Sequence, residues 1–525
     1  MLASDPVSAA ERPPRAGSFP GETAVAVLLP LLAGLWSLRL GADFNYDLRH
    51  YHFYNGWALV TGRLDHDLAP AGLQSFFNPL QDGLYYLGIR HLPPRLFGFL
   101  LGALHGTALV LVHRIARHAL AGDPGGRWLA LLATVLAALG ANALSLVGTT
   151  TGDLLVILPA LLALLLVVGG EAPWRPAAAG FAAGIAAGLK LTMLFPAAAL
   201  AAALALPGAG RRPAALVRFA GVGLLGYLAV AGFWSARLLE RFANPVFPFL
   251  NGLFLSPFFR TEGVFEPRFT AREWWEGLGL PLQMAMGWTS GLQEIRFREA
   301  RFLLVFGALA VWLVARRRGP ASGPLNRTSR ILLSFWLVGY LLWAYGLHYF
   351  RYAAILELLA PLVVLVLLRA SLAGRPAVIL ALALVAVLAS RPVSWGRVAW
   401  SDDWFGVRLP ATPGLERGLV IVAGERVSYV APFFPPSTVF VGLTWRGSPG
   451  LDGLVAGRLL SHPGPFFLLQ GVGGRPSDAA RFGLLPTGEC RRIETRDGGL
   501  CLWALARPAS TMIWYGPLDS SGTVG

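Results

Sequence analysis

The chain has 525 residues, of which 55% are hydrophobic and only 14% are charged, and its mean hydropathy is +0.56. These values exclude an ordinary soluble globular protein and are typical of a protein with several membrane spans. The formal net charge of +15 does not indicate nucleic-acid binding, because basic residues gather in short segments between apolar runs, as the positive-inside rule describes.

The first predicted span runs from about residue 22 to 40, after a polar N-terminal tail, residues 1–20, that shows no cleavable signal peptide. Residues 177–206 predict two short helices that meet at Gly188–Thr192. Together with the other apolar runs they bring the total to about eleven spans. These other runs lie near 96–117, 127–147, 153–169, 216–235, 301–315, 330–347, 353–369 and 375–390.

Basic residues predict the topology of the spanning region, residues 21–392. Arg12 and Arg15 of the tail and the loop at Arg211-Arg212 are expected on the cytoplasmic side. The long loops 42–95 and 236–300 are then expected on the outer side, and so is the C-terminal region.

The C-terminal region, residues 393–525, differs in composition and alternates strand-like with helical segments. The fold class we predict is therefore an α-helical polytopic membrane protein with a small C-terminal α/β domain on the outer side. Cys490 and Cys501 flank a turn signal at Asp497–Gly499, so a disulfide would form there in an oxidising compartment, with two free thiols as the alternative. The predicted strands are 419–423, 438–441 and 465–470, and the predicted helices are 451–460 and 477–483.

Asp43 and Asp47 follow the first span directly. Carboxylates beside a membrane are costly and tend to be kept for function. Aromatic residues, histidines and Arg49 accompany them, which indicates an acid/base site at the bilayer surface. Residues 47–60 predict an amphipathic helix along the interface, with Tyr51 on its apolar face.

Metal binding in the first outer loop has only a weak signal. Asp65-His66-Asp67 has the spacing of an acidic metal pair, but a solvated turn explains it as well. His50 and His52 also lie in this loop, and nothing fixes a ligand geometry. We therefore assign no metal ligands from the sequence.

Three further charged residues lie near predicted span ends. Asp153 opens a span after Gly148–Gly152 and could instead cap the helix. Lys190 lies between two short helices, where it needs an anionic partner or reaches the membrane surface. Arg351, before Tyr352, offers a fork of donors to phosphate oxygens or pairs with an acid such as Glu357.

These segments together resemble the GT-C superfamily of membrane glycosyltransferases. The resemblance covers roughly residues 20–390 in order and topology, and each motif alone is weak. The matching segments are Asp47–Tyr51 with Gly62–Leu64, Asp153, Gly188–Thr192, Asn244–Pro248 and Arg351-Tyr352. The Asn244–Pro248 segment is similar to one in bacterial members of the superfamily.

The resemblance implies a sugar donor on a polyprenyl phosphate and a glycan, lipid or protein acceptor, in a bacterial inner membrane. Asp47 or Asp43 would be the general base, and the transfer would invert the anomeric centre. Some members use a divalent metal and others do not, and the sequence does not decide between them. The residues expected to bind the substrates are Asp153, Lys190, Arg351, Tyr352, Tyr51 and Arg237.

Three alternatives remain open at this stage. A transporter or flippase of a lipid-linked sugar would show internal repeats and polar residues deep in its spans. An oligosaccharide ligase would carry basic residues and histidines in a late loop, whereas the acids here come early. A scaffold anchored by its spans would use the C-terminal domain as its binding module.

Overall fold

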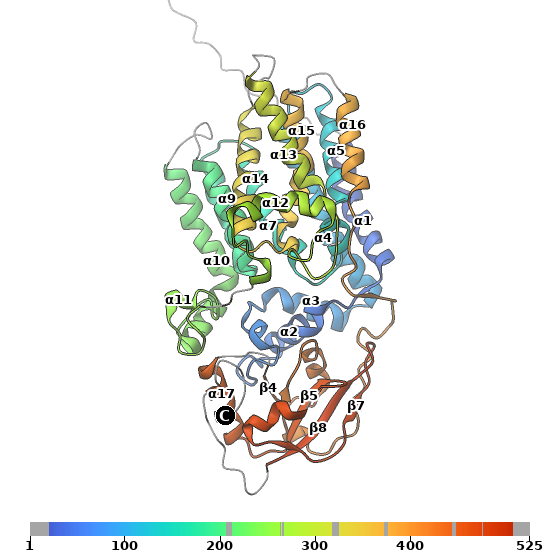
Figure 1. The fold of residues 1–525 in the computed structure, drawn as a ribbon, viewed down its shortest axis with the longest axis vertical. Coiled ribbons are helices and arrows are strands. Elements are labelled where there is room, and N and C mark those ends of the chain that lie inside the picture. Colours follow the sequence, from blue (N-terminus) through green and yellow to red (C-terminus); the bar gives the residue numbers. More distant parts are fainter. Residues whose placement is uncertain are drawn as a thin grey trace, which may run out of the picture.

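Most of the described chain is helical, and a small mixed sheet lies at its C-terminal end (Figure 1). The N-terminal tail with Arg12 and Arg15, and the predicted cytoplasmic pair Arg211-Arg212, lie outside the described residues. The computed structural model describes residues 20–205, 213–262, 264, 267–317, 325–371, 376–443, 448–474 and 476–507.

Helices occur at each apolar run that the sequence predicts. Four of those described are long and apolar enough to cross a membrane: residues 21–40, 94–119, 213–242 and 350–371. The bundle consists of α1 (Pro20–Leu40), α4 (Pro94–Ala119), α5 (Gly126–Ala138), α6 (Ala141–Leu146), α7 (Asp153–Val168), α8 (Arg175–Leu189), α9 (Leu194–Ala205), α10 (Pro213–Phe242), α13 (Arg301–Arg317), α14 (Arg327–Tyr345), α15 (Ala354–Ser371) and α16 (Pro376–Leu388).

Two of the four long helices expose apolar side chains over much of their length. Only 11% of the most apolar part of α1 and 17% of that of α10 is buried. Large apolar faces of this kind are rare on water-soluble monomers and normal on helices that contact lipid. Exposed residues on these faces include Leu28, Leu32, Leu35, Leu224, Leu225, Leu228 and Phe233.

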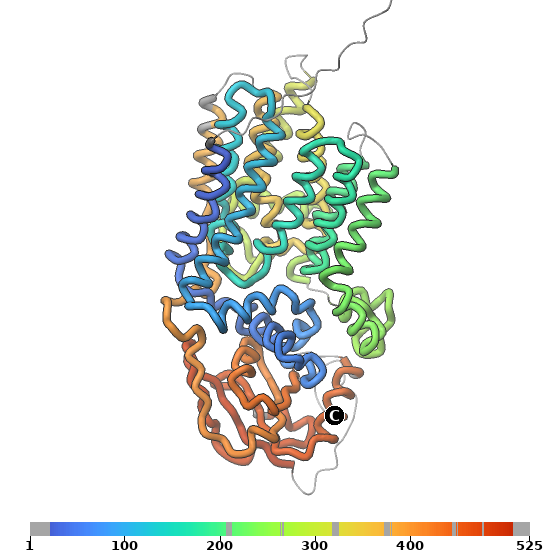
Figure 2. Tube along the Cα trace, turned by 180° about the vertical axis from the view of Figure 1, so that it is seen from behind, coloured from blue at the N-terminus to red at the C-terminus, as the bar shows by residue number. Residues whose placement is uncertain are grey.

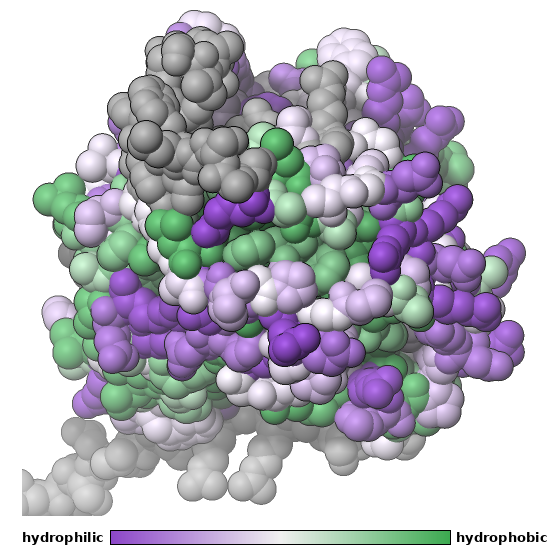
Figure 3. Space-filling model, turned by 90° about the horizontal axis from the view of Figure 1, so that it is seen from below, coloured by the Kyte–Doolittle hydropathy of each residue, from purple (hydrophilic) through white to green (hydrophobic). Residues whose placement is uncertain are grey.

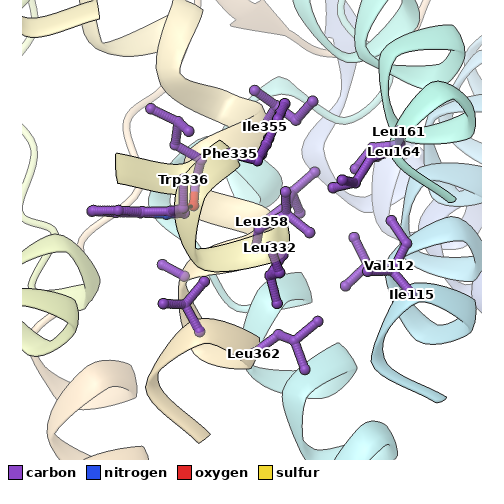
Figure 4. Close-up of a cluster of buried hydrophobic side chains, with 14 of the residues drawn as sticks. Val112, Ile115, Leu161, Leu164, Leu332, Phe335, Trp336, Ile355, Leu358 and Leu362 are labelled. Carbon is purple, nitrogen blue, oxygen red and sulfur yellow. Dashed lines mark hydrogen bonds between the residues drawn. The ribbon is translucent and has the colours of Figure 1, made fainter. Parts of the chain in front are cut away.

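Helix α15 forms the centre of the bundle and is buried on every side. Its residues are apolar all round apart from Glu357 and a final basic turn, which suits a helix that other helices surround. Figure 4 shows the packing: Ile355, Leu358 and Leu362 of α15 face Leu332 and Phe335 of α14, with residues of α4 and α7 beyond them.

The predicted meeting of two short helices at Gly188–Thr192 is present. Helix α8 ends at Leu189, and α9 follows after the short 3-10 turn η3 (Leu191–Met193). Gly184 of α8 lies so close to α10 that a Cβ atom there would come within 1.9 Å of the Gly223 carbonyl oxygen. Gly180 and Gly188 pack against α10 in the same way, as expected for a row of small residues between helices.

The first loop forms a layer between the bundle and the sheet domain, as both ribbon views show (Figures 1 and 2). It contains the π-helical turn η1 (Leu48–His52), α2 (Phe53–Val60), η2 (Gly72–Phe76) and α3 (Leu80–His91). This part of the loop is helical, as predicted, but it does not lie along the membrane interface. Residues 50–58 are buried within the protein. The sheet domain covers the face that was expected to meet water or lipid.

The second long loop carries α11 (Asn251–Phe254), η4 (Pro267–Phe269) and α12 (Trp274–Met286). Helix α12 crosses the bundle in Figure 1. The hydroxyl groups of Tyr340 and Tyr345 hold it to α14 by donating to the carbonyl oxygens of Gly277 and Trp274.

The C-terminal domain is an α/β unit, in agreement with the predicted alternation. Strand β3 (Leu419–Val422) pairs in parallel with β4 (Val439–Gly442) and β5 (Phe466–Gly471), and β5 pairs antiparallel with β8 (Leu500–Ala506). The predicted short helix 477–483 is present as the 3-10 helix η8 (Pro476–Phe482). The remaining elements are η7 (Ser428–Phe433), α17 (Pro449–Ser461), β6 (Leu485–Pro486) and β7 (Arg491–Ile493).

The first loop extends this sheet. The Leu68 amide donates to the Phe440 carbonyl and the Leu68 carbonyl accepts from Gly442, which forms a parallel bridge on the edge of β4. Asp67 accepts the Phe440 amide at 2.9 Å and is paired with Arg63. An edge strand covered in this way joins the loop and the domain into one structural unit.

Cys490 and Cys501 form a disulfide. Replacing both with serine is expected to lower the free energy of unfolding of the sheet domain by about 2–4 kcal/mol, because the unfolded chain gains freedom. Thermal unfolding in detergent would measure this loss. Reduction of the parent protein should reproduce the shift, and equal midpoints for parent and variant would contradict the prediction.

The end of the molecule that the sheet domain forms has a mixed surface, with hydrophilic side chains interspersed among hydrophobic ones (Figure 3). This differs from the apolar faces of α1 and α10. A mixed surface is what a water-facing domain presents.

Candidate active site

Asp47 lies just before η1, at the inner side of the first loop. Its side chain is 13% exposed, and its Oδ2 atom accepts a hydrogen bond of 2.8 Å from the Arg351 guanidinium. Arg351 belongs to the 3-10 turn η5 (Phe350–Ala353), which leads into α15. The pairing that the sequence left open for Arg351 is therefore with Asp47 and not with Glu357.

Arg351 and Lys190 share a second acid, Asp153. The Arg351 Nε atom lies 3.7 Å from Asp153 Oδ2, and the Lys190 Nζ atom lies 2.5 Å from Asp153 Oδ1. Lys190 also donates to the Thr151 carbonyl at 3.2 Å, and its Nζ atom lies 5.0 Å from the centre of the Tyr352 ring. Asp47, Arg351, Asp153 and Lys190 thus form a continuous chain of alternating charge, which we call the charge chain.

The chain fold explains why these residues meet. Asp47 follows α1, Asp153 begins α7, Lys190 ends α8 and Arg351 precedes α15. Each residue lies at a helix end, where backbone groups are free for bonding and helix packing leaves room for polar side chains. The predicted N-capping role of Asp153 is not what the structure has, because Gly152 is the N-cap residue.

Burial and a neighbouring cation act against each other on Asp47. Burial alone would raise the pKa of this carboxyl, but the charge of Arg351 outweighs it, with help from His52 and Lys190, and lowers the pKa below its usual value. Asp47 is thus ionised, as a proton acceptor must be at neutral pH.

The charge chain contains polar atoms that are buried without a hydrogen bond. Two of these atoms are Asp153 Oδ2 and Arg351 Nε, which lie 3.7 Å apart. Close by, His52 Nε2 and Asp82 Oδ2 also have no partner within the described part of the chain. Because buried polar groups are nearly always paired in folded proteins, such a group of atoms is typical of a site that binds a ligand or water.

The sequence did not predict the pair of His52 and Asp82. His52 Nδ1 lies 2.6 Å from Asp82 Oδ1, and both side chains are buried. Burial raises the pKa of Asp82, while the charge of His52 acts against that rise. The two residues are thirty positions apart on η1 and α3, so no local spacing could have indicated the pair; their shared loop was the only signal.

Asp43 differs from Asp47, although the sequence offered both as the base. Its carboxylate accepts hydrogen bonds from the Asn45 amide group at 2.8 and 2.9 Å and from the Thr150 hydroxyl and backbone N–H at 2.8 Å. It is 1% exposed and lies on β1 (Ala42–Asp43), which pairs with β2 (Arg397–Val398). These contacts suit a carboxylate that fixes the fold between the first loop and Thr150.

Two more predicted site residues lie at different places. Tyr51 is buried beside the charge chain, where burial and then the charge of Asp47 raise its pKa. Arg237 does not reach the charge chain: it pairs with Asp65, which also contacts Arg241 at 2.8 Å. Arg237 and Arg241 line a separate cavity of about 40 Å³ between α10 and the first loop.

The acidic triplet Asp65-His66-Asp67 has arginine partners. Asp67 is held by Arg63 and by the Tyr54 hydroxyl at 2.8 Å, and it lies in the contact with β4. Among the residues that the structure describes, no three His, Cys, Asp or Glu side chains are placed to hold a metal ion.

The sheet domain contacts the first loop at His50, three residues after Asp47. The imidazole Nδ1 accepts the Arg426 backbone N–H at 3.2 Å, which requires Nδ1 to be unprotonated. Burial lowers the pKa of His50, against the charges of Glu425 and Asp47, which raise it.

Acidification should therefore weaken this contact. Because the folded-state pKa of His50 lies below its unfolded value of about 6.5, its contribution to stability is present above that value and is lost as the pH falls through the folded pKa. We expect the unfolding temperature to fall between about pH 7 and pH 5. His50→Asn, whose amide oxygen takes the place of Nδ1 and accepts the same hydrogen bond at any pH, should show a smaller fall, and an equal fall in both proteins would contradict this explanation.

The geometry is thus an ionised, partly exposed acid beside two cations, where the helix ends, the first loop and the sheet domain meet. No protein-family model matches the chain, and no curated protein matches its sequence.

Proposed function

We propose that the chain is a membrane glycosyltransferase of the GT-C superfamily, which moves a sugar from a polyprenyl-phosphate donor to an acceptor on the extracytoplasmic face. The charge chain supports this most directly, because it offers Asp47 as a proton acceptor beside Arg351 and Lys190 as cations for a phosphate. The order of the segments that resemble the superfamily adds to it.

The proposal includes about eleven spans within residues 21–392, a cytoplasmic N-terminus and a sheet domain outside a bacterial inner membrane. The exposed apolar faces of α1 and α10 support the membrane setting. The Cys490–Cys501 disulfide supports an oxidising compartment for the sheet domain.

The proposed reaction is a single displacement. Asp47 takes the proton of the acceptor hydroxyl as its oxygen attacks the anomeric carbon of the donor sugar. The bond from that carbon to the phosphate oxygen breaks, and its electron pair stays with the lipid phosphate, whose charge Arg351 and Lys190 stabilise. Attack opposite the leaving phosphate inverts the anomeric centre.

Donor binding would also activate Asp47. Arg351 now holds the pKa of Asp47 low, and a bound phosphate would compete for the same guanidinium donors. As Arg351 turns to the phosphate, Asp47 loses part of its stabilising partner and becomes a better proton acceptor. The unpaired Arg351 Nε and Asp153 Oδ2 atoms would find partners in the donor.

Arg237 would have a separate role in this scheme. It lies with Arg241 near the end of α10, beside the apolar residues Trp234 and Phe242. Such a combination suits a lipid phosphate before it reaches Lys190, with the polyprenyl tail along the exposed face of α10.

The test is sugar transfer in membranes from a panel of radiolabelled polyprenyl-phosphate sugars, with an extract of cell-envelope lipids and glycans as acceptors. Transfer of a single sugar that requires Asp47 would support the proposal. Movement of the labelled donor across the membrane without transfer would indicate the transporter or flippase instead. Transfer of a whole oligosaccharide would indicate the ligase. If the donor is neither moved nor used for transfer, the scaffold is the alternative that agrees with the result.

A further inference from the structure

The carboxyl end of strand β3 leads to η1, the turn that Asp47 precedes. Residues Gly424–Arg426 follow the strand after Ala423, and the Arg426 backbone N–H donates to His50 of η1. In α/β sheets, ligands bind at the carboxyl ends of parallel strands, at the point where the strand order reverses. Strand β3 is the middle one of three parallel strands, between β4 and β5, and the chain passes from one side of it to the other.

Three exposed side chains gather at this point. Tyr46, from the first loop, is 37% exposed, and the Glu425 side chain lies near enough for its charge to act on the Tyr46 hydroxyl. The Arg426 guanidinium carbon lies 5.9 Å from the centre of the Tyr46 ring. The group therefore combines an aromatic ring, an acid and a base from two parts of the chain that are far apart in sequence.

Their backbone is held in an unusual conformation. Arg426 has a φ angle of +61°, a region that residues with a Cβ atom rarely adopt. Such conformations persist where the surroundings impose them, and they concentrate at functional sites. Here the hydrogen bond from Arg426 to His50 supplies part of that constraint.

Contacts on the far side hold the domain against the first loop. Asp497 pairs with Arg49 of η1 and accepts a hydrogen bond of 3.0 Å from the Tyr429 hydroxyl. The bridge between Leu68 and β4 holds the other side. The loop Gly424–Arg426 is therefore held in a fixed position over η1.

We propose that Tyr46, Glu425 and Arg426 form the acceptor subsite and that the acceptor is a saccharide; this rests on the proposed function. Asp47 links the two groups: it follows Tyr46 directly in the chain, and its carboxylate pairs with Arg351. The cations Arg351 and Lys190 face the donor phosphate, and the three exposed residues face the acceptor.

The chemistry of the group selects this ligand class. A tyrosine ring stacks on the C–H face of a sugar, while Glu425 accepts and Arg426 donates hydrogen bonds to hydroxyl groups. An anionic acceptor would meet the Glu425 carboxylate, which disfavours a second phosphate here. A neutral polyol meets no such repulsion and would place one hydroxyl toward Asp47.

Three variants test the subsite. Tyr46→Ala removes the ring, Glu425→Gln removes the charge, and Arg426→Asn removes the guanidinium while asparagine tolerates a positive φ. Glu416→Gln and Arg417→Ala, at exposed positions of the same domain, are the matched controls. Each test variant is expected to raise the acceptor KM about tenfold, which corresponds to a loss of about 1.4 kcal/mol of binding, with the donor KM and kcat little changed.

Saccharide binding is measured separately from transfer. Saturation-transfer difference NMR on the full chain in nanodiscs, with methyl glycosides of glucose, galactose, mannose and N-acetylglucosamine, should give signals that Tyr46→Ala reduces and the controls keep. Binding of this kind without any transfer would overturn the proposed function and leave the saccharide subsite standing. Transfer with an unchanged acceptor KM in all three variants, or no glycoside binding by wild type, would overturn the subsite.

Discussion

Asp47→Asn is expected to lower the rate of sugar transfer about 10²–10⁴-fold, the usual contribution of a general base. Asparagine keeps the size of the side chain and can still accept a hydrogen bond from Arg351, but it cannot take the proton of the acceptor hydroxyl. Donor binding and protein level should persist, and both can be measured in the same membranes.

The matched control is Asp402→Asn. Asp402 is an exposed aspartate that lies outside the charge chain and does not line the cavity beside α10. Its loss should leave the transfer rate within about a factor of two to three, as expected for a substitution at an exposed position. Full transfer by Asp47→Asn would remove Asp47 from the chemistry and direct attention to Asp153.

Lys190→Met is expected to destabilise the protein by about 3–5 kcal/mol, because it leaves the buried Asp153 carboxylate without its closest partner. Thermal unfolding in nanodiscs measures the loss. Asp153 is 1% exposed, so water compensates its charge less well than the lost ammonium group does.

The double variant Lys190→Met with Asp153→Asn separates stability from function. It removes the uncompensated charge and should recover most of the stability, while sugar transfer stays low because a cation for the leaving phosphate is missing. Arg241→Met, which breaks an exposed pair, is the control and should cost no more than about 1 kcal/mol. A double variant as unstable as the single one would show that the pair acts mainly through packing.

The helices could be predicted because apolar runs and glycines act locally. The sequence predicts a break between two helices at Lys190, because glycines precede this residue and polar residues lie at the break. The structure has the break at this position, between α8 and η3. The number of spans could not be predicted in the same way. Helices α5 and α16 have 13 residues each, and this length alone does not decide whether a helix crosses a bilayer.

The roles of Asp43 and Asp47 could not be separated from the sequence. Both are aspartates four residues apart in the same loop, with similar neighbours. Their difference comes from distant partners: Thr150 saturates one carboxylate, and Arg351 pairs with the other. Contacts across one hundred to three hundred positions leave no local pattern. For the same reason the sequence predicted that residues 47–60 form an amphipathic helix along the membrane interface, where the sheet domain packs instead.

The bridge between Leu68 and β4 has a consequence for biosynthesis. The ribosome makes the first loop near the start of the chain and its partner strand, residues 439–442, near the end. The loop that carries Asp47 therefore cannot complete its packing until most of the polypeptide has been synthesised. Prematurely terminated chains would leave this layer open, with buried polar groups exposed, and a quality-control protease could recognise them by that exposure.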